Sequence, residues 1–104
     1  MMTVDAAFDR IGSALRERGY AFTKEGKPSD APHDRLAVFS SSDMSVRVCW
    51  VDKARLLILQ VQMGAEWVEF ARRSFGPKGL EETTVEALVR AVYAEVAETS
   101  TDGG

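Results

Sequence analysis

The side chains that most often perform catalysis or bind metals are scarce in this sequence. His33 is the single histidine. Asp30 and Asp34 lie close to it, in the pattern D-x-x-H-D, and could be drawn as part of a metal site. One histidine with two carboxylates falls short of a closed zinc site, which usually takes several His or Cys ligands. We therefore expect residues 24–34 to form a solvated polar loop and the chain to hold no metal.

Cys49, the single cysteine, lies between Val48 and Trp50 in a segment that alternates like a β-strand. A nucleophilic cysteine needs a nearby base or an electropositive, partly exposed setting, and the one histidine is far away in the sequence. We expect a buried or half-buried structural cysteine. The Gly-Pro-Lys-Gly turn at residues 76–79 lacks the Lys-Ser/Thr ending of a phosphate-binding loop. The sequence therefore predicts no catalytic residue and no cofactor, and a protein that is not an enzyme.

A mixture of aromatic and basic side chains in residues 64–79 is the pattern that best indicates binding. Aromatic residues and arginine are enriched at the energetic centres of protein interfaces. The same mixture can stack single-stranded nucleic acid, but this segment is close to neutral. We therefore expect a protein partner and no nucleic acid, unless the aromatic side chains belong to the core and the basic ones to a solvated rim. The predicted surface consists of Trp67, Phe70, Arg72, Arg73 and Phe75, with Leu56 and Ile58 from the preceding strand.

The elements that must position this surface are organised around residues 46–63. Residues 45–51 alternate between apolar and other side chains, as a half-buried strand does. Residues 56–59 are apolar on both sides, which is typical of a central strand covered at least partly on each face. A second apolar face, if the chain leaves it uncovered, indicates a partner or a second copy. We assign Val46, Val48, Trp50, Val61 and Met63 to the inward face, and Phe39, Val51, Leu56 and Ile58 to the second face.

Two segments have the apolar periodicity of amphipathic helices. In residues 4–18 the apolar side chains fall three or four positions apart, Thr3 is a suitable N-cap and Gly19 a suitable residue to end the helix. In residues 83–99 the opening Thr-x-x-Glu predicts a capping box. The core should contain the apolar stripes of both helices and the inward faces of the strands. The predicted core residues are Phe8, Ile11, Leu15, Val48, Trp50, Leu57, Leu59, Val61, Leu88, Val89 and Val92.

Three consecutive antiparallel strands are expected at residues 36–41, 45–51 and 55–63, and residues 20–23 could add a fourth strand at an edge. Residues 64–79 are ambiguous. Their aromatic residues have helical spacing and a Gly-Pro pair would stop a helix, so a short helix is favoured. The same residues also fit a strand that would extend the sheet.

Length and composition indicate one globular domain. The chain has 104 residues, of which 45% are hydrophobic and 28% are charged. The net charge is −3, and residues 81–104 contain six acidic side chains against one arginine. A single cysteine excludes an internal disulfide and fits a reducing cytoplasm. The N-terminus carries acids where a signal peptide would be basic, and no apolar run approaches the roughly 18 residues of a membrane span. We therefore expect a cytoplasmic protein with no membrane contact.

These observations predict a two-layer α+β domain over residues 1–104, with residues 100–104 as a flexible tail. An antiparallel sheet of three to four strands should carry the N- and C-terminal helices on one face. The function we predict is a non-catalytic, cytoplasmic protein-binding module of adaptor, chaperone-like, immunity-like or antitoxin-like type, whose partner is another protein or a second copy. The alternative is a small-ligand-binding protein or enzyme with a pocket between helices and sheet, which would place polar residues in the core.

Overall fold

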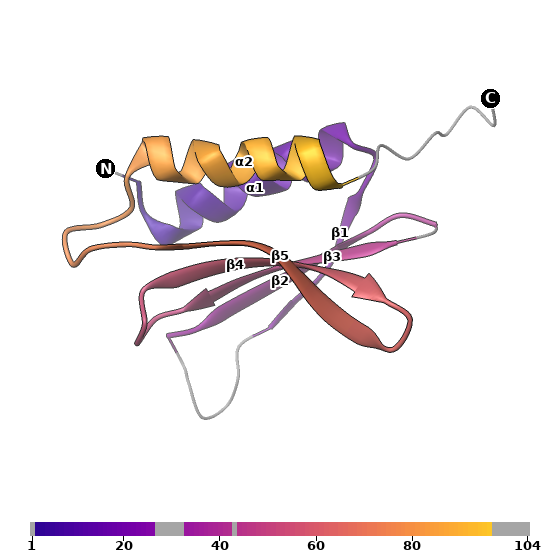
Figure 1. Cartoon of the computed structure of the whole chain (residues 1–104), viewed down its shortest axis with the longest axis horizontal. Helices are drawn as coiled ribbons and strands as arrows, with labels where there is room; N and C mark the ends of the chain where they lie inside the picture. The colour runs from indigo at the N-terminus through magenta and orange to yellow at the C-terminus, as the bar shows by residue number, and fades with distance from the viewer. Residues whose placement is uncertain (1, 27–32, 43, 97–104) are drawn as a thin grey trace.

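The computed structural model describes residues 2–26, 33–42 and 44–96. Both helices lie on one face of a single antiparallel sheet (Figure 1). The five strands follow the order β1-β2-β3-β4-β5, so strands that are consecutive in the chain are neighbours. The predicted α+β class and placement of the helices are confirmed, whereas the predicted count of three to four strands is wrong. The elements are α1 (Val4–Glu17), β1 (Ala21–Gly26), β2 (Arg35–Ser40), β3 (Ser45–Val51), β4 (Leu56–Met63), β5 (Glu66–Ser74) and α2 (Glu82–Glu95).

The β3–β4 hairpin forms the centre of the sheet, as predicted. Val48 lies opposite Leu59 and Trp50 opposite Leu57 in the antiparallel register, and all four side chains are buried beneath the helices. The indole Nε1 of Trp50 donates a hydrogen bond to the Asp52 carboxylate at 3.0 Å, which ties the tryptophan to the turn. Because side chains alternate along a strand, this register also fixes which residues face away from the helices.

Helix α1 begins and ends as the sequence predicts. The hydroxyl of Thr3 accepts a hydrogen bond from the backbone N–H of Ala6 at 3.0 Å, which is an N-cap. Gly19 has a φ angle of 92°, the left-handed conformation that commonly follows the last turn of a helix. Ile11 and Leu15, in the middle of the apolar stripe, are fully buried. The helix therefore packs on the sheet through the face that its periodicity defines.

Helix α2 begins slightly earlier than predicted, ends at Glu95, and has no capping box. Its N-cap side chain makes no capping hydrogen bond. An isolated backbone bridge between Leu80 and the N-terminal segment fixes the chain just ahead of the helix, so Thr83 falls inside the first turn. The Glu86 carboxylate instead accepts two hydrogen bonds from the Arg10 guanidinium, at 2.8 and 3.0 Å. This bidentate pair joins α2 to α1.

The short helix favoured for residues 64–79 is wrong, because residues 66–74 form strand β5. The uncovered edge of β4 offers a backbone ladder along the whole length of β5, and pairing of this kind overrides weak local preference. One extra residue, Phe70, makes a β-bulge between the pairs Gln60–Glu69 and Leu59–Ala71. Strand β1 confirms the candidate edge strand but is longer, reaching Gly26 in the segment predicted to be a loop.

The core lies between the helices and the sheet, and all the predicted core residues except Val61 are buried. Val61 is half-buried and Met63, which we assigned inward, is 58% exposed. Both residues belong to the end of β4, and the β4–β5 hairpin curves away from the helices (Figure 1). Phe39, which we assigned to the second apolar face, is buried beneath α1 instead, because it pairs with Val46 in the register of β2 and β3.

Gly12 of α1 lies against Phe39 of β2, and this contact gives the first prediction. A Cβ atom on Gly12 would lie 2.9 Å from the tip of the Phe39 ring. Alanine usually stabilises a helix by about 1 kcal/mol over glycine. Here we expect Gly12→Ala to lower the free energy of unfolding by about 1–2 kcal/mol, because it overpacks the core. Urea denaturation measures the change.

The exposed neighbour Ser13 supplies the control, since Ser13→Ala adds no core volume and should leave stability equal or higher. In a Phe39→Leu background the Gly12→Ala substitution should cost less, because the shorter side chain vacates the contact. A Gly12→Ala variant that is more stable than the natural chain would show that the helix and the sheet are not packed this closely.

Candidate functional site

The two faces of the sheet differ, and the face away from the helices is the candidate site. Both helices lie on the other side (Figure 1), and among the described residues no helix crosses this face. Its residues are defined by the register of the strands, because directly opposite residues point to the same side. We call it the open face. It includes Lys24, Leu36, Val38, Arg47, Cys49, Val51, Leu56, Ile58, Gln60, Trp67, Glu69 and Arg72.

The centre of the open face is an apolar stripe across β2, β3 and β4. Cys49 lies opposite Leu36 on one side and opposite Ile58 on the other, and Val51 lies opposite Leu56. All these side chains are half-buried, so each is shielded by its neighbours and still accessible. Cross-strand pairs of this kind stabilise a sheet, and together they present a continuous apolar surface.

Arg47 is held in place on this face by two contacts. Its guanidinium carbon lies 4.4 Å from the centroid of the Trp67 ring, a cation–π contact that fixes the plane of the group. Its Nε–H donates a hydrogen bond to Oε1 of Gln60 at 2.7 Å, and Gln60 is the residue directly opposite in the register. The guanidinium is therefore oriented by contacts within the chain, and Gln60 uses only its Nε–H.

The remaining charges of the open face are mostly positive. Arg72 and Glu69 form a bidentate pair, with Arg72 donating from Nε at 2.7 Å and from Nη2 at 2.5 Å. This hydrogen bonding lowers the pKa of Glu69 and raises that of Arg72. Both side chains reach the same face because the bulge in β5 offsets the alternation between them. Lys24 lies opposite Val38 at the β1 edge, so the described part of the face carries excess positive charge.

The Cys49 thiol is half-buried and donates to Oε1 of Gln60 at 3.5 Å. Burial raises the pKa of this thiol, and the positive charge of Arg47 only partly opposes the effect. The sulfur is therefore a protonated thiol near neutral pH rather than the thiolate that a nucleophile requires. The half-buried placement agrees with the prediction from the sequence.

The structure divides the predicted binding surface into two groups. Trp67 and Arg72 from β5 reach the open face, where they join Leu56 and Ile58 of β4. The other three predicted residues do not. Phe70 and Phe75 pack against the core, Phe75 with its ring centroid 6.2 Å from that of Trp50, and Arg73 is opposite the buried Leu57 on the helix side.

Sequence reasoning missed the residues that complete the site, Arg47 and Gln60 above all. Both were visible as polar positions that alternate with core positions in their strands. Their importance depends on Trp67, which lies beside them only because β5 is a strand. A helix at this position, as we favoured, would have left Arg47 an ordinary surface side chain.

The histidine region shows structural contacts. His33 is exposed, and Asp30 lies outside the described residues. Asp34 Oδ1 accepts a hydrogen bond from the backbone N–H of Asp52 at 2.8 Å, so this carboxylate secures the β3–β4 turn. Within the described residues no group of three or more His, Cys, Asp and Glu side chains could hold a metal ion.

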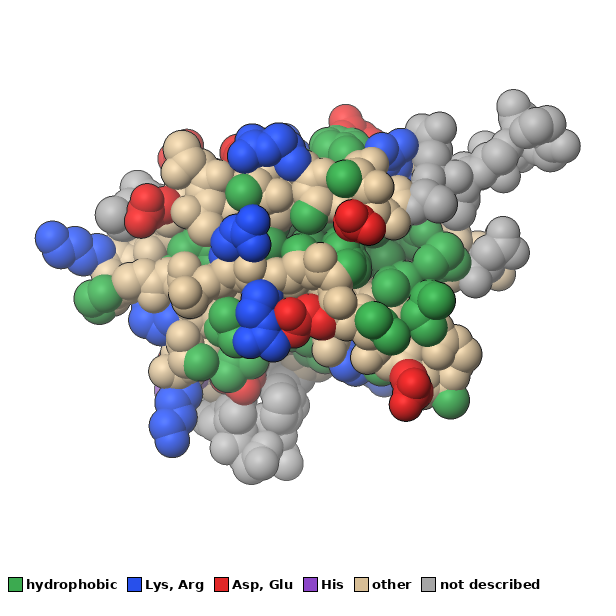
Figure 2. Space-filling view, in the orientation of Figure 1, with side chains coloured by type: hydrophobic (Ala, Val, Ile, Leu, Met, Phe, Trp, Pro, Cys, Tyr) green, Lys and Arg blue, Asp and Glu red, His purple; other side chains and the backbone are tan. Residues whose placement is uncertain are grey.

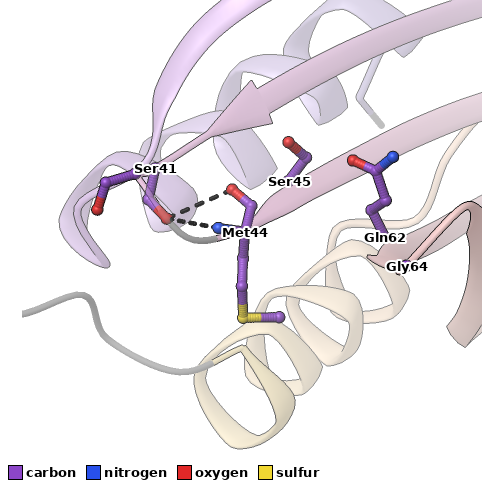
Figure 3. Close-up of a pocket in the computed structure, with 6 residues that line it drawn as sticks. Ser41, Met44, Ser45, Gln62 and Gly64 are labelled. Carbon is purple, nitrogen blue, oxygen red and sulfur yellow. Dashed lines mark hydrogen bonds between the residues drawn. The ribbon is translucent and has the colours of Figure 1, made fainter.

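A hollow of about 390 Å³ lies where the β2–β3 turn approaches the end of β4 (Figure 3). The hydroxyl of Ser41 accepts a hydrogen bond from the N–H of Met44 and donates one to its carbonyl, at 3.1 and 3.3 Å. None of the described lining residues has a titratable side chain. The described part of its lining therefore offers mainly hydroxyl and amide groups. It is lined by Ser41, Ser42, Met44, Ser45, Gln62 and Gly64.

A smaller hollow of about 200 Å³ lies between α1 and strands β1 and β2. Its walls include Phe8, Phe22 and Phe39. The Arg35 guanidinium lies 4.5 Å from the Phe8 centroid and pairs with Glu25 at 2.5 Å, so its charge is already balanced within the chain. Sites for small molecules usually have volumes of about 300–1,000 Å³. This hollow is of the size of one side chain.

A second apolar area lies on the helix side of the β4–β5 hairpin. Figure 2 shows hydrophobic side chains gathered at this end of the molecule. Val68 is 46% exposed and lies opposite Val61, and Met63 follows on the same side of β4. The exposed apolar side chains described in this area are Val68 and Met63, and neither is a tryptophan.

Comparisons of the chain with protein-family models, with curated proteins and with solved structures found no match. Any functional conclusion therefore depends on the chemistry of the open face itself. One further finding bears on location: within the described residues, neither helix is long and apolar enough to cross a membrane.

The surroundings of Cys49 give a testable prediction about its reactivity. Because burial raises the pKa of the thiol, the folded chain should react with a disulfide reagent more slowly at neutral pH than the chain in urea. The pH at which the rate reaches half its maximum should also be higher in the folded chain. Arg47→Met should raise this pH further, since it removes the positive charge that favours the thiolate. Fast labelling of the folded chain at neutral pH would contradict the assignment.

Proposed function

We propose that the protein is a non-catalytic binding module that holds another polypeptide against the open face of its sheet. The observation that carries the proposal is the apolar stripe of β2, β3 and β4 with the oriented Arg47–Trp67 pair beside it. Apolar surface bordered by polar groups is typical of interaction sites. Tryptophan and arginine are the residues whose truncation most often weakens protein complexes.

The chemistry of the open face supports contact rather than catalysis. Its thiol is protonated, and its one acidic side chain, Glu69, is occupied by Arg72. The hydrogen bonds of Arg47 and Gln60 orient side chains and leave no acid–base pair aimed at a common point. A face built in this way offers a partner shape, apolar area and a fixed cation.

Two kinds of biological role fit such a module. One is an adaptor or chaperone-like protein that covers an exposed segment of its partner, and the other is an immunity- or antitoxin-like protein that masks a partner's active surface. A half-buried free thiol without a disulfide is compatible with a reducing compartment, and we propose a cytoplasmic location on this basis.

The test uses the tagged full chain, purified gently from its own cells, with its native mass and composition measured. We expect a stoichiometric protein partner. Ile58→Asp and Trp67→Ala should each weaken this complex at least tenfold, because loss of a central interface side chain costs about 2 kcal/mol or more and about 1.4 kcal/mol corresponds to a factor of ten. Circular dichroism checks that each variant remains folded.

Val68→Asp is the matched control. Like Ile58→Asp, it replaces a β-branched side chain of the β4–β5 hairpin with a carboxylate, but on the helix side of the sheet. This variant should bind normally. If Val68→Asp abolished the complex while Ile58→Asp and Trp67→Ala left it unchanged, the partner would bind the helix side of the hairpin and the proposal would be wrong.

A further inference from the structure

We propose that the segment bound on the open face carries a carboxylate between large apolar side chains, and that Arg47 receives this carboxylate. The inference rests on the proposed function and adds the chemistry of the partner. It commits to an acidic, apolar segment of another protein, rather than to a second copy of this chain.

The state of Arg47 is the first argument. The Nε–H is used by Gln60 and the ring of Trp67 covers one side of the group. Among the described residues no carboxylate forms an ion pair with Arg47, in contrast to Arg10, Arg35 and Arg72. An arginine that is already oriented loses less conformational freedom on binding a carboxylate than a free one.

The surroundings of Arg47 define what must flank the acid. Val38 lies directly opposite Arg47 on β2, and Cys49 follows on the same face of β3. Trp67 covers the other side. A carboxylate that reaches Arg47 therefore lies between positions that favour apolar contact. A purely polar acidic segment would leave these side chains uncovered, so apolar neighbours on the partner are required.

The charge balance of the face is the second argument. Arg72 and Glu69 neutralise each other, so the positive charge of the described open face comes from Lys24 and Arg47. The face thus attracts an acidic segment and repels a basic one. Two copies joined symmetrically through this face would bring the same positive surfaces together, which is unfavourable. The open face is therefore positive although the whole chain has a net charge of −3.

The size of the face is the third argument. Five strands about 4.8 Å apart, with about seven residues of about 3.3 Å each, span roughly 550 Å². A stable interface of standard size buries about 800 Å² on each partner. The open face is therefore suited to a short segment, and it is small for a stable dimer of this chain.

The experiment selects twelve-residue random peptides displayed on phage against the immobilised full chain. The enriched peptides are synthesised, and their dissociation constants are measured by fluorescence anisotropy. We expect Asp or Glu flanked by large apolar residues, and weaker binding at higher salt. Arg47→Met should weaken binding at least tenfold. Arg90→Met, at an exposed position on α2, should leave it unchanged.

Two further variants separate a charge effect from damage to the fold. Arg47→Lys keeps the charge but loses the planar fork, and should bind with intermediate affinity. Arg47→Glu should fail to bind the acidic peptide and should recover binding when the peptide's acid is changed to lysine. Circular dichroism confirms that each variant is folded. Absence of this recovery in a folded variant would overturn the direct contact.

The outcomes also distinguish this inference from the proposed function. Peptides that lose binding with Ile58→Asp, yet are basic or uncharged and indifferent to Arg47→Met, would overturn the carboxylate inference and leave the open face as the binding site. Peptides indifferent to both substitutions, or a selection with no enrichment, would overturn both. A dimer in sedimentation experiments that Ile58→Asp dissociates would show that a second copy is the occupant and would overturn the inference.

Discussion

The fold depends on a strand that is apolar on both sides. In β4, Leu57 and Leu59 face the helices and are fully buried, while Leu56 and Ile58 alternate with them and face away. Two helices can cover only one side of a single sheet in a chain of this size. The sequence therefore places apolar area on the second side of the sheet, where no described helix covers it.

Much of the fold follows from local patterns in the sequence. Helix α1 was predictable from Thr3, Gly19 and its apolar spacing, and the central hairpin from the alternation around Trp50. Strand β5 was not, because its aromatic residues satisfy helical and strand spacing alike, and the deciding factor is the unpaired edge of β4. The predicted capping box is also absent because of a contact distant in sequence, since a backbone bridge at Leu80 sets the start of α2.

The candidate site was predictable where residue type identifies its members, and not where contacts between strands do. Leu56, Ile58, Trp67 and Arg72 could be identified by residue type, whereas the contribution of Arg47 required knowledge of its neighbours across three strands. Its contacts with Gln60 on β4 and the indole ring on β5 are long-range in sequence. A single sequence contains the residues of such a cluster but not their proximity, which arises only once the sheet is assembled.

The bulge in β5 has a consequence beyond the side chains that it reorients. Strands β1 and β5 are the two edges of the sheet, and an edge strand presents unpaired N–H and C=O groups to any other extended chain. Each edge has one extra residue that breaks its regular pairing, at Phe70 in β5 and at Thr23 in β1. Bulges of this kind hinder the edge strand of one sheet from pairing with the edge strand of another. The protein can therefore expose an apolar sheet face while its edge strands resist the growth of larger aggregates.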